Sequence, residues 1–187
     1  MILPIYAYGQ PVLKKVAQDI TPDYPDLPAL IDNMWETMYN AEGVGLAAPQ
    51  IGLSIRLFLV DSTQMEKEGE DFTGIKQAFI NAQIIEETGA DFSYEEGCLS
   101  IPDVRGDVER PERVTLRYQD ADFNEFTRTF TGLNARVIQH EYDHIDGILF
   151  TELLKPIKKR LVKRKLGKIK DGKIKADYRM KFAVQRR

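Results

Sequence analysis

The chain has two histidines, His140 and His144, and both lie in the stretch Gln-His-Glu-Tyr-Asp-His at residues 139–144. On a helix, side chains four residues apart lie on one face, which suits two imidazoles that bind one metal ion. Glu141 lies between them and is a candidate general base toward a metal-bound water. The alternative is a charged surface helix with incidental histidines, and His-Glu-x-x-His alone does not exclude it.

A catalytic metal site of this kind needs a third protein ligand and keeps one position for water. Since no further histidine exists, that ligand must be Cys, Asp or Glu. The only cysteine, Cys98, lies in Glu96-Gly-Cys-Leu-Ser100. A lone cysteine is usually a small buried apolar residue, and this alternative remains open. A Cys-His-His set would instead use every Cys and His of the chain around one metal, which would lower the pKa of its water toward about 7.

A glycine-rich stretch, Gly43-Val-Gly-Leu-Ala-Ala-Pro-Gln-Ile-Gly52, precedes these residues in the chain. Its small residues predict an exposed, flexible backbone that a ligand can approach closely. Gln50 is its only side-chain hydrogen-bond donor. A helix end followed by a tight turn is an equally good interpretation of the same residues.

Composition favours one domain, because 187 residues with 43% hydrophobic content suffice for a sizeable core. A single cysteine excludes an intramolecular disulfide and fits a reducing compartment. The N-terminus lacks the basic region of a signal peptide, and no apolar run approaches membrane-spanning length. We therefore expect a soluble, cytoplasmic protein without a membrane partner.

Charge is segregated along the chain. Residues 155–187 carry 15 of the 26 Lys and Arg and two acids, a net charge of +13 (15 − 2), whereas residues 1–154 carry 11 basic and 27 acidic residues, a net charge of −16 (11 − 27). We interpret residues 1–154 as one catalytic domain and 155–187 as a basic C-terminal helix and tail. The tail either neutralises the acidic body or contacts a polyanion such as RNA.

Hydrophobic periodicity predicts an α+β fold in which antiparallel sheet packs around a central helix. Val114, Leu116 and Tyr118 show the alternation of a strand. Helices are expected at residues 24–41, from Leu133 to Gly147, and from Leu154 to a stop at Gly167. After this stop, Lys168–Lys175 has the alternation of a hairpin around Asp171-Gly172, with disorder as the alternative because so many like charges lie there. Strands are expected at residues 56–61, 78–80, 84–85, 104–110, 112–119 and 125–131, with a polar loop at 62–76.

Three stretches resemble, in order, the signature motifs of the peptide deformylase family. They are Gly43-Val-Gly-Leu-Ala-Ala-Pro-Gln50, Glu96-Gly-Cys-Leu-Ser100 and Gln139-His-Glu-Tyr-Asp-His144. The resemblance implies removal of the N-formyl group from the initiator methionine of new bacterial polypeptides, so N-formylmethionyl nascent peptides would be the substrates. It also implies one divalent metal per chain, Fe²⁺ in the family, often replaced by Zn²⁺ or Ni²⁺ in purified protein.

The resemblance also implies roles for single residues in the reaction. Cys98, His140 and His144 would bind the metal, and Glu141 would be the general acid and base while the metal-bound water attacks the formyl carbonyl. The side chain of Gln50 and the backbone N–H of Leu99 would then stabilise the oxyanion.

Substrate contacts follow less directly from the same resemblance. Gly45 would hydrogen-bond the peptide backbone, and Val44, Leu133 and Val137 would line an apolar pocket for the methionine side chain. Arg136 would place a cation at the rim of that pocket. Arg105 is a further candidate for contacting the peptide backbone, with an ordinary surface arginine as the alternative.

Two other function classes compete with this interpretation. A metallopeptidase with His-Glu-x-x-His takes a downstream His or Glu as third ligand, but no His follows His144 and Glu152 is the only later Glu. An RNA-binding adaptor with a structural metal would use a closed site with four protein ligands. The lack of a suitable downstream ligand disfavours the metallopeptidase, and Glu141 beside an open position favours catalysis over the adaptor.

Overall fold

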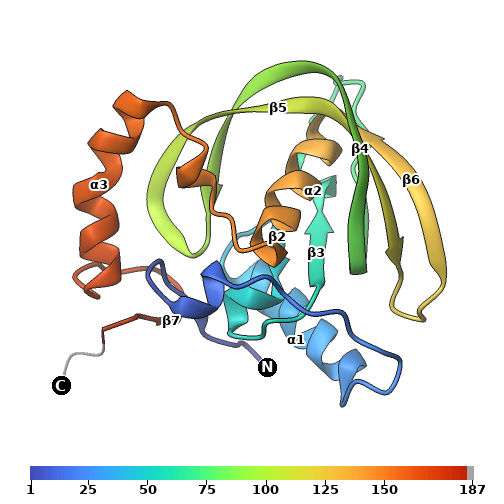
Figure 1. Cartoon of the computed structure of the whole chain (residues 1–187), viewed down its shortest axis with the longest axis horizontal. Coiled ribbons are helices and arrows are strands. Elements are labelled where there is room, and N and C mark those ends of the chain that lie inside the picture. Colours follow the sequence, from blue (N-terminus) through green and yellow to red (C-terminus); the bar gives the residue numbers. More distant parts are fainter. Residues whose placement is uncertain (185–187) are drawn as a thin grey trace.

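The computed structural model describes residues 1–184 and has an α+β architecture (Figure 1). A five-stranded antiparallel sheet runs in the order β2-β3-β4-β5-β6, and the long ribbon of β4 and β5 arches over helix α2. The predicted fold class is therefore confirmed. The strands are β2 (Gly45–Ala47), β3 (Leu57–Asp61), β4 (Lys76–Cys98), β5 (Ile101–Gln119) and β6 (Glu125–Thr131).

The ribbon of β4 and β5 is longer than the sequence patterns predict. The expected separate strands at 104–110 and 112–119 are one strand, and those at 78–80 and 84–85 belong to β4. Pro111 lies inside β5, opposite Asp91, next to a shift in register between Thr88 and Asp91. Since a β-bulge relieves local pairing and bends a strand, such irregularities let the ribbon continue past Pro111 and curve.

Helix α2 (Gly132–Ile145) lies inside this curve and carries the His-Glu-x-x-His motif. Its apolar side packs on the aromatic core of the sheet, where Phe58 and Phe79 stack with ring centroids 4.8 Å apart. Helix α1 (Leu27–Asn40) covers a second core formed with β2 and β3. Both helices fall within one to three residues of their predicted bounds.

The glycine-rich stretch is buried and ordered, so the prediction of an exposed, flexible backbone was wrong. It forms the edge strand β2 and a 3₁₀ turn, η2 (Ala48–Ile51). The reason lies in packing. A Cβ atom at Gly45 would overlap the carboxylate of Glu141, so the missing side chain is what allows β2 and α2 to approach each other.

The C-terminal region differs from its prediction. Helix α3 (Pro156–Lys170) continues through Gly167, where a Cβ would meet open space, and the hairpin expected at Lys168–Lys175 is absent from the described residues. Gly172, with φ of +64°, follows the helix end. The chain then returns so that β7 (Met180–Lys181) pairs in parallel with β1 (Ile5–Tyr6).

Helix α3 is packed against the body along one side. Val162 and Ile169 are buried in a cluster with residues of β5, among them Ile101 and Val108. Within residues 1–184, no helix combines the length and apolar character needed to cross a bilayer. Three further 3₁₀ turns connect the elements: η1 (Pro11–Lys14), η3 (Ser62–Met65) and η4 (Phe150–Glu152).

Candidate metal centre

Cys98, His140 and His144 come together although they lie on two elements. Cys98 is the last residue of β4, and the histidines project from α2. One ligand atom from each residue lies within 4.8 Å of the others, and Cys98 Sγ is 3.4 Å from His144 Nε2. The structure therefore brings the single cysteine next to both histidines, even though the sequence separates Cys98 from them.

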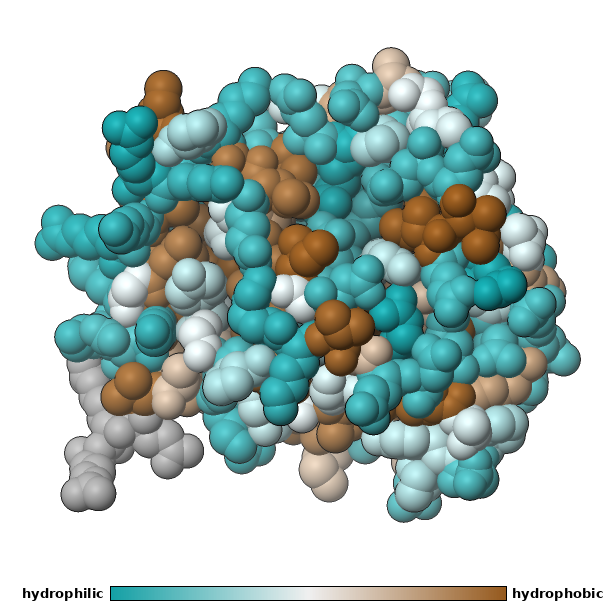
Figure 2. All heavy atoms as spheres, in the orientation of Figure 1, coloured by the Kyte–Doolittle hydropathy of each residue, from teal (hydrophilic) through white to brown (hydrophobic). Residues whose placement is uncertain are grey.

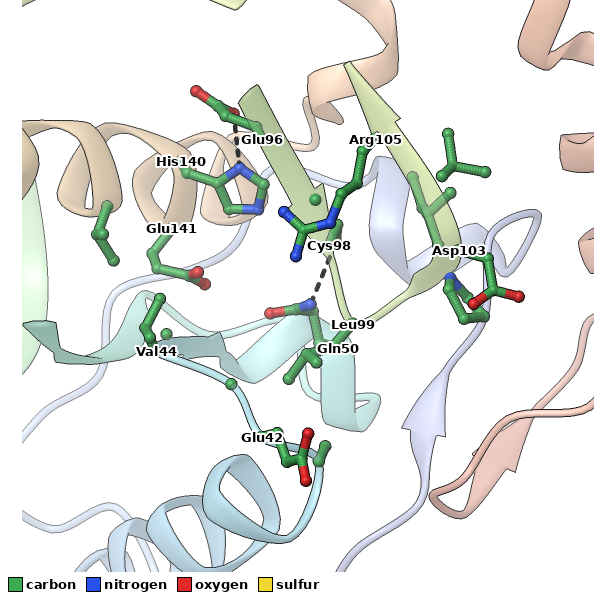
Figure 3. Close-up of a pocket in the computed structure, with 18 of the residues that line it drawn as sticks. Glu42, Val44, Gln50, Glu96, Cys98, Leu99, Asp103, Arg105, His140 and Glu141 are labelled. Carbon is green, nitrogen blue, oxygen red and sulfur yellow. Dashed lines mark hydrogen bonds and ion pairs between the residues drawn. The ribbon is translucent and has the colours of Figure 1, made fainter. Parts of the chain in front are cut away.

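This group fits a divalent metal by its chemistry. One thiol and two imidazoles are ligands suited to zinc and to first-row transition metals. The Nδ1 atom of His140 is engaged with Glu96 Oε2 at 2.8 Å, which leaves Nε2 to face Cys98 and His144 (Figure 3). Burial lowers the pKa of His144 well below its ordinary value and so favours the neutral imidazole that metals bind.

Glu96 has a structural role that the sequence reasoning missed. It is 5% exposed and accepts hydrogen bonds from Arg110 Nε at 2.6 Å and Arg136 Nη1 at 2.9 Å. Burial by itself raises the pKa of this carboxyl, but His140 and Arg110 outweigh it and hold the pKa far below the usual range. A carboxylate behind a metal-binding histidine fixes the ring orientation. Its place two residues before Cys98 is the only local sequence signal for this role.

Glu141 lies beside the metal-binding group on the cavity side of α2 (Figure 3). It is 4% exposed, and burial raises the pKa of its carboxyl to about 7. Its Oε2 atom has no hydrogen-bond partner among the described residues. A buried carboxylate with an unpaired oxygen next to a metal-binding group is available to exchange a proton with a substrate or a water.

Gln50 approaches the same group from η2. Its Oε1 accepts from the backbone N–H of Ala47 at 2.8 Å, while its Nε2 lies 3.2 Å from Ser100 Oγ and 3.5 Å from Cys98 Sγ. Leu99 and Ser100 form the turn between β4 and β5. The two predicted oxyanion donors, Gln50 and Leu99, thus lie on adjoining segments beside Cys98.

A cavity of about 570 Å³ opens in front of these residues. Its walls include the predicted substrate contacts Val44, Gly45, Val137 and Arg105, together with Gln50, Cys98, Leu99, His140 and Glu141. The half-buried Leu133 lies outside this set, so the structure does not bring it to the cavity.

Arg136, expected at the pocket rim, lies at the cavity but is not an exposed rim cation. Although it reaches the cavity wall, its side chain is 2% exposed and its guanidinium bonds to Glu96 and to the carbonyl of Val108 at 2.9 Å. It also lies over the ring of Phe92, at 4.4 Å from the centroid. Arg136 therefore supports the interior behind His140.

An α+β fold whose central buried helix carries His-Glu-x-x-His, with a cysteine completing the donor set at a cavity, defines a class: the metal-dependent hydrolases. The model of the family described as polypeptide deformylase matches residues 2–160. The chain belongs to this family. It is an enzyme, a hydrolase that acts on formylmethionyl peptides, and the metal dependence of the family agrees with the group around Cys98.

Individual relatives agree with the family assignment. The chain is 56% identical to a peptide deformylase from Christiangramia forsetii, over 97% of this chain and 96% of that protein. It is 55% identical to a peptide deformylase from Flavobacterium johnsoniae, over 100% of this chain and 99% of that protein. Among solved structures, a peptide deformylase from Legionella pneumophila matches with a TM-score of 0.79 and 38% identity, covering 92% of this chain and 98% of that one.

Proposed function

We propose that this enzyme hydrolyses the formyl amide of N-formylmethionyl nascent peptides at one divalent metal held by Cys98, His140 and His144. The observation that carries the proposal is the gathering of their ligand atoms within 4.8 Å beside a cavity whose walls include Cys98, His140 and Glu141. We propose Fe²⁺ as the native metal, from the family resemblance, with Zn²⁺ or Ni²⁺ able to take its place in purified protein.

The metal, when bound, supplies a Lewis acid that activates water and polarises the formyl carbonyl. Glu141 accepts the proton of the attacking water and passes it to the nitrogen of the leaving methionyl amine. The carboxylate is suited to this shuttle because it is buried beside the three ligands and has an unpaired oxygen. The products are formate and a peptide with a free N-terminal methionine.

Charge that develops on the formyl oxygen is stabilised by the Nε2–H of Gln50 and the backbone N–H of Leu99. Support comes from the position of Gln50, whose Oε1 is fixed by Ala47 while its Nε2 points to Cys98. A donor held in place before the reaction costs no reorganisation when the negative charge forms, and it acts strongly in a site that excludes water.

The peptide backbone binds along Gly45, because β2 is the edge strand of the sheet and has a partner only in β3. A free strand edge suits an extended peptide. Val44 and Val137 receive the methionine side chain, and both lie on the cavity wall. Arg105, which is exposed at the same wall, is placed to contact the peptide further along.

The basic surface of α3 is proposed to contact ribosomal RNA. Of the cations in residues 155–170, Lys155 pairs with Glu109 at 3.0 Å and Lys165 with Asp103 at 3.8 Å, within the described part of the chain. Among the described residues, the remaining cations of this range form no ion pair with the acidic body. Figure 2 shows hydrophilic side chains projecting from the α3 edge.

The test of the metal centre is anaerobic metal analysis together with a deformylation assay on formyl-Met-Ala. Replacing Cys98, His140 or His144 by Ala should remove most metal and most activity. The matched control is Glu125→Ala, which alters an exposed residue of β6 and should keep both. Full metal occupancy in Cys98→Ala would exclude this ligand set, and wild-type enzyme without deformylation would exclude the function.

A further inference from the structure

The C-terminal segment at residues 173–182, which follows α3, reaches the active-site cavity. Lys175, Ala176, Asp177 and Tyr178 line the same cavity as Cys98, although the sequence places them far apart. From the sequence, the basic tail is expected to be separate from the catalytic domain. The structure instead gives the cavity one wall that belongs to this segment.

Pairing with the N-terminus holds the segment in this position. β7 pairs with β1, the N–H of Ile5 donates to the carbonyl of Arg179 at 2.9 Å, and that of Ala7 to the carbonyl of Lys181 at 3.0 Å (Figure 1). The side chain of Gln10 donates to the carbonyl of Phe182 at 2.8 Å. These hydrogen bonds give the wall a defined position, because each one satisfies a backbone carbonyl of the C-terminal segment.

Tyr178 connects the wall to the turn at Leu99 and Ser100. Its hydroxyl donates to the carbonyl oxygen of Leu99 at 2.7 Å, and both Tyr178 and Leu99 are half-buried against the core that α1 covers. Burial raises the pKa of this hydroxyl, which therefore stays protonated and able to donate. The N–H of Tyr8 holds the next carbonyl, that of Ser100, at 2.8 Å.

Each residue of the turn region thus has its own restraint. Gln50 contacts Cys98 and Ser100, Tyr8 holds the carbonyl of Ser100, and Tyr178 holds that of Leu99. A change of about 1 Å in the position of a catalytic group can lower a rate by about 10²-fold. The peptide plane after Leu99 is fixed by a residue of the C-terminal segment, so that segment bears on the geometry of the reacting atoms.

The wall also carries charge toward the cavity. Lys175 and Asp177 are exposed and line it, and so do the exposed residues Asp103 and Arg105 of β5. Figure 3 shows the Arg105 guanidinium in front of Cys98, and Asp103 on the far side of Cys98 from Glu141. These charges share one cavity with Val44 and Val137, which are proposed to receive the methionine side chain, so the residues that follow the methionine can meet them there.

We propose that residues 173–182 form a wall of the peptide cleft that contributes to catalysis and to substrate selection. Tyr178 is a positioning residue for the turn at Leu99. Lys175 selects among the side chains that follow the methionine. This inference rests on the proposed function. It makes the C-terminal segment part of the catalytic unit in addition to any role of α3 in docking.

The positioning role is tested with Tyr178→Phe in the full-length holoenzyme, which removes one hydroxyl and keeps the ring. We expect kcat to fall about 3- to 10-fold, the effect of one hydrogen bond, with KM and metal content unchanged. Hydrogen exchange of the amides in residues 98–101 should accelerate. The control is Tyr24→Phe, because Tyr24 packs in the same core but does not line the cavity. Unchanged kcat and exchange in Tyr178→Phe would overturn the role.

The selecting role is tested with Lys175→Glu and the control Lys168→Glu on α3. Lys175→Glu should alter the ratio of KM for peptides with Glu or Lys after the methionine by about 2- to 5-fold, the size of an exposed ion pair. The control Lys168→Glu should leave both this ratio and KM for formyl-Met-Ala unchanged, because Lys168 does not line the cavity. A ratio equal to that of the wild type would overturn selection. If wild-type enzyme did not deformylate any peptide, the proposed function itself would fail.

Discussion

Glu96 Oε2 and His140 Nδ1 lie 2.8 Å apart, both buried, with the histidine on α2 and the carboxylate on β4. Because the ring donates its Nδ1 proton to Glu96, Nε2 is left as the ligand atom. Arg110 and Arg136 bind the same carboxylate and keep it ionised. A histidine that binds metal is thus oriented by a buried ionic cluster reaching into β5.

Replacing Glu96 tests this cluster. Glu96→Ala leaves Arg110 and Arg136 buried without their shared partner, and breaking a buried ion pair costs about 3–5 kcal/mol in the free energy of unfolding. Metal affinity should fall about 10- to 100-fold, as expected when the partner of a ligand is lost. Urea unfolding and competition with a chelator measure the two effects. Glu96→Gln, which keeps the shape of the side chain, should lose less stability and less metal affinity than Glu96→Ala. Equal metal affinity in Glu96→Ala and the wild type would refute the orienting role.

Glu141→Gln separates proton transfer from metal binding. The amide occupies the same space and leaves Cys98, His140 and His144 in place, so metal content should stay at the wild-type level. Turnover of formyl-Met-Ala should fall by about 10²–10⁴, because an amide cannot carry the proton. Near wild-type kcat in this variant would rule Glu141 out as the acid and base.

Gln50→Ala tests the oxyanion donor. If Nε2 stabilises the transition state, kcat should fall about 10²–10³-fold while the metal is retained. Because Gln50 also contacts Ser100, the control Ser100→Ala removes that contact and leaves the donor, and its loss in kcat should be much smaller. An effect of Gln50→Ala confined to KM would instead indicate ground-state binding of the substrate.

Gly45→Ala tests the close approach of β2 and α2. The added Cβ would overlap the Glu141 carboxylate and displace it. We expect kcat to fall about 10²-fold, since a shift of about 1 Å in a catalytic group has this effect. The control Gly167→Ala adds a methyl in open space on α3 and should stabilise the protein by about 0.5–1 kcal/mol. Steady-state kinetics and urea unfolding report the two outcomes; full activity of Gly45→Ala would show that Glu141 can move without loss.

The ligand group was predictable because its residue types are rare. The chain has only one Cys and two His, so a single metal site that uses Cys98, His140 and His144 was the simplest interpretation of the sequence. The apolar spacing along α2 and the alternation at Val114 and Leu116 likewise gave the central helix and its sheet, since both patterns report directly which face is buried.

What the sequence did not reveal depends on contacts between distant segments. Arg110 and Arg136 meet Glu96 from a strand and a helix, and no spacing encodes that meeting. Local rules also failed where tertiary packing outweighed them: Gly167 does not end α3, because the buried Ile169 holds the next turn against the body. The hydrogen bond from Tyr178 to the carbonyl of Leu99 has no local signal in the sequence either.

The last prediction concerns the exposed cations of α3. Truncation of the tail would remove Tyr178 and β7 along with the charges, so substitution to Gln is the sharper experiment. Lys159, Arg160 and Lys163 are exposed and lie in one stretch of the helix. If they contact RNA phosphates, replacing all three should weaken co-sedimentation with ribosomes at low salt and reduce the slope of log affinity against log salt by about 0.7–0.9 per contact.

A matched control removes as many exposed cations from the body: Lys67, Arg113 and Arg117, each to Gln. Since these lie away from α3, the control should sediment with ribosomes like the wild type, despite the same loss of net charge. Hydrolysis of formyl-Met-Ala should be unchanged in both triple variants, because none of the six residues lines the cavity. Equal sedimentation of the α3 variant and the wild type, with equal salt slopes, would show that α3 is not a ribosome contact and that its cations serve only to offset the acidic body.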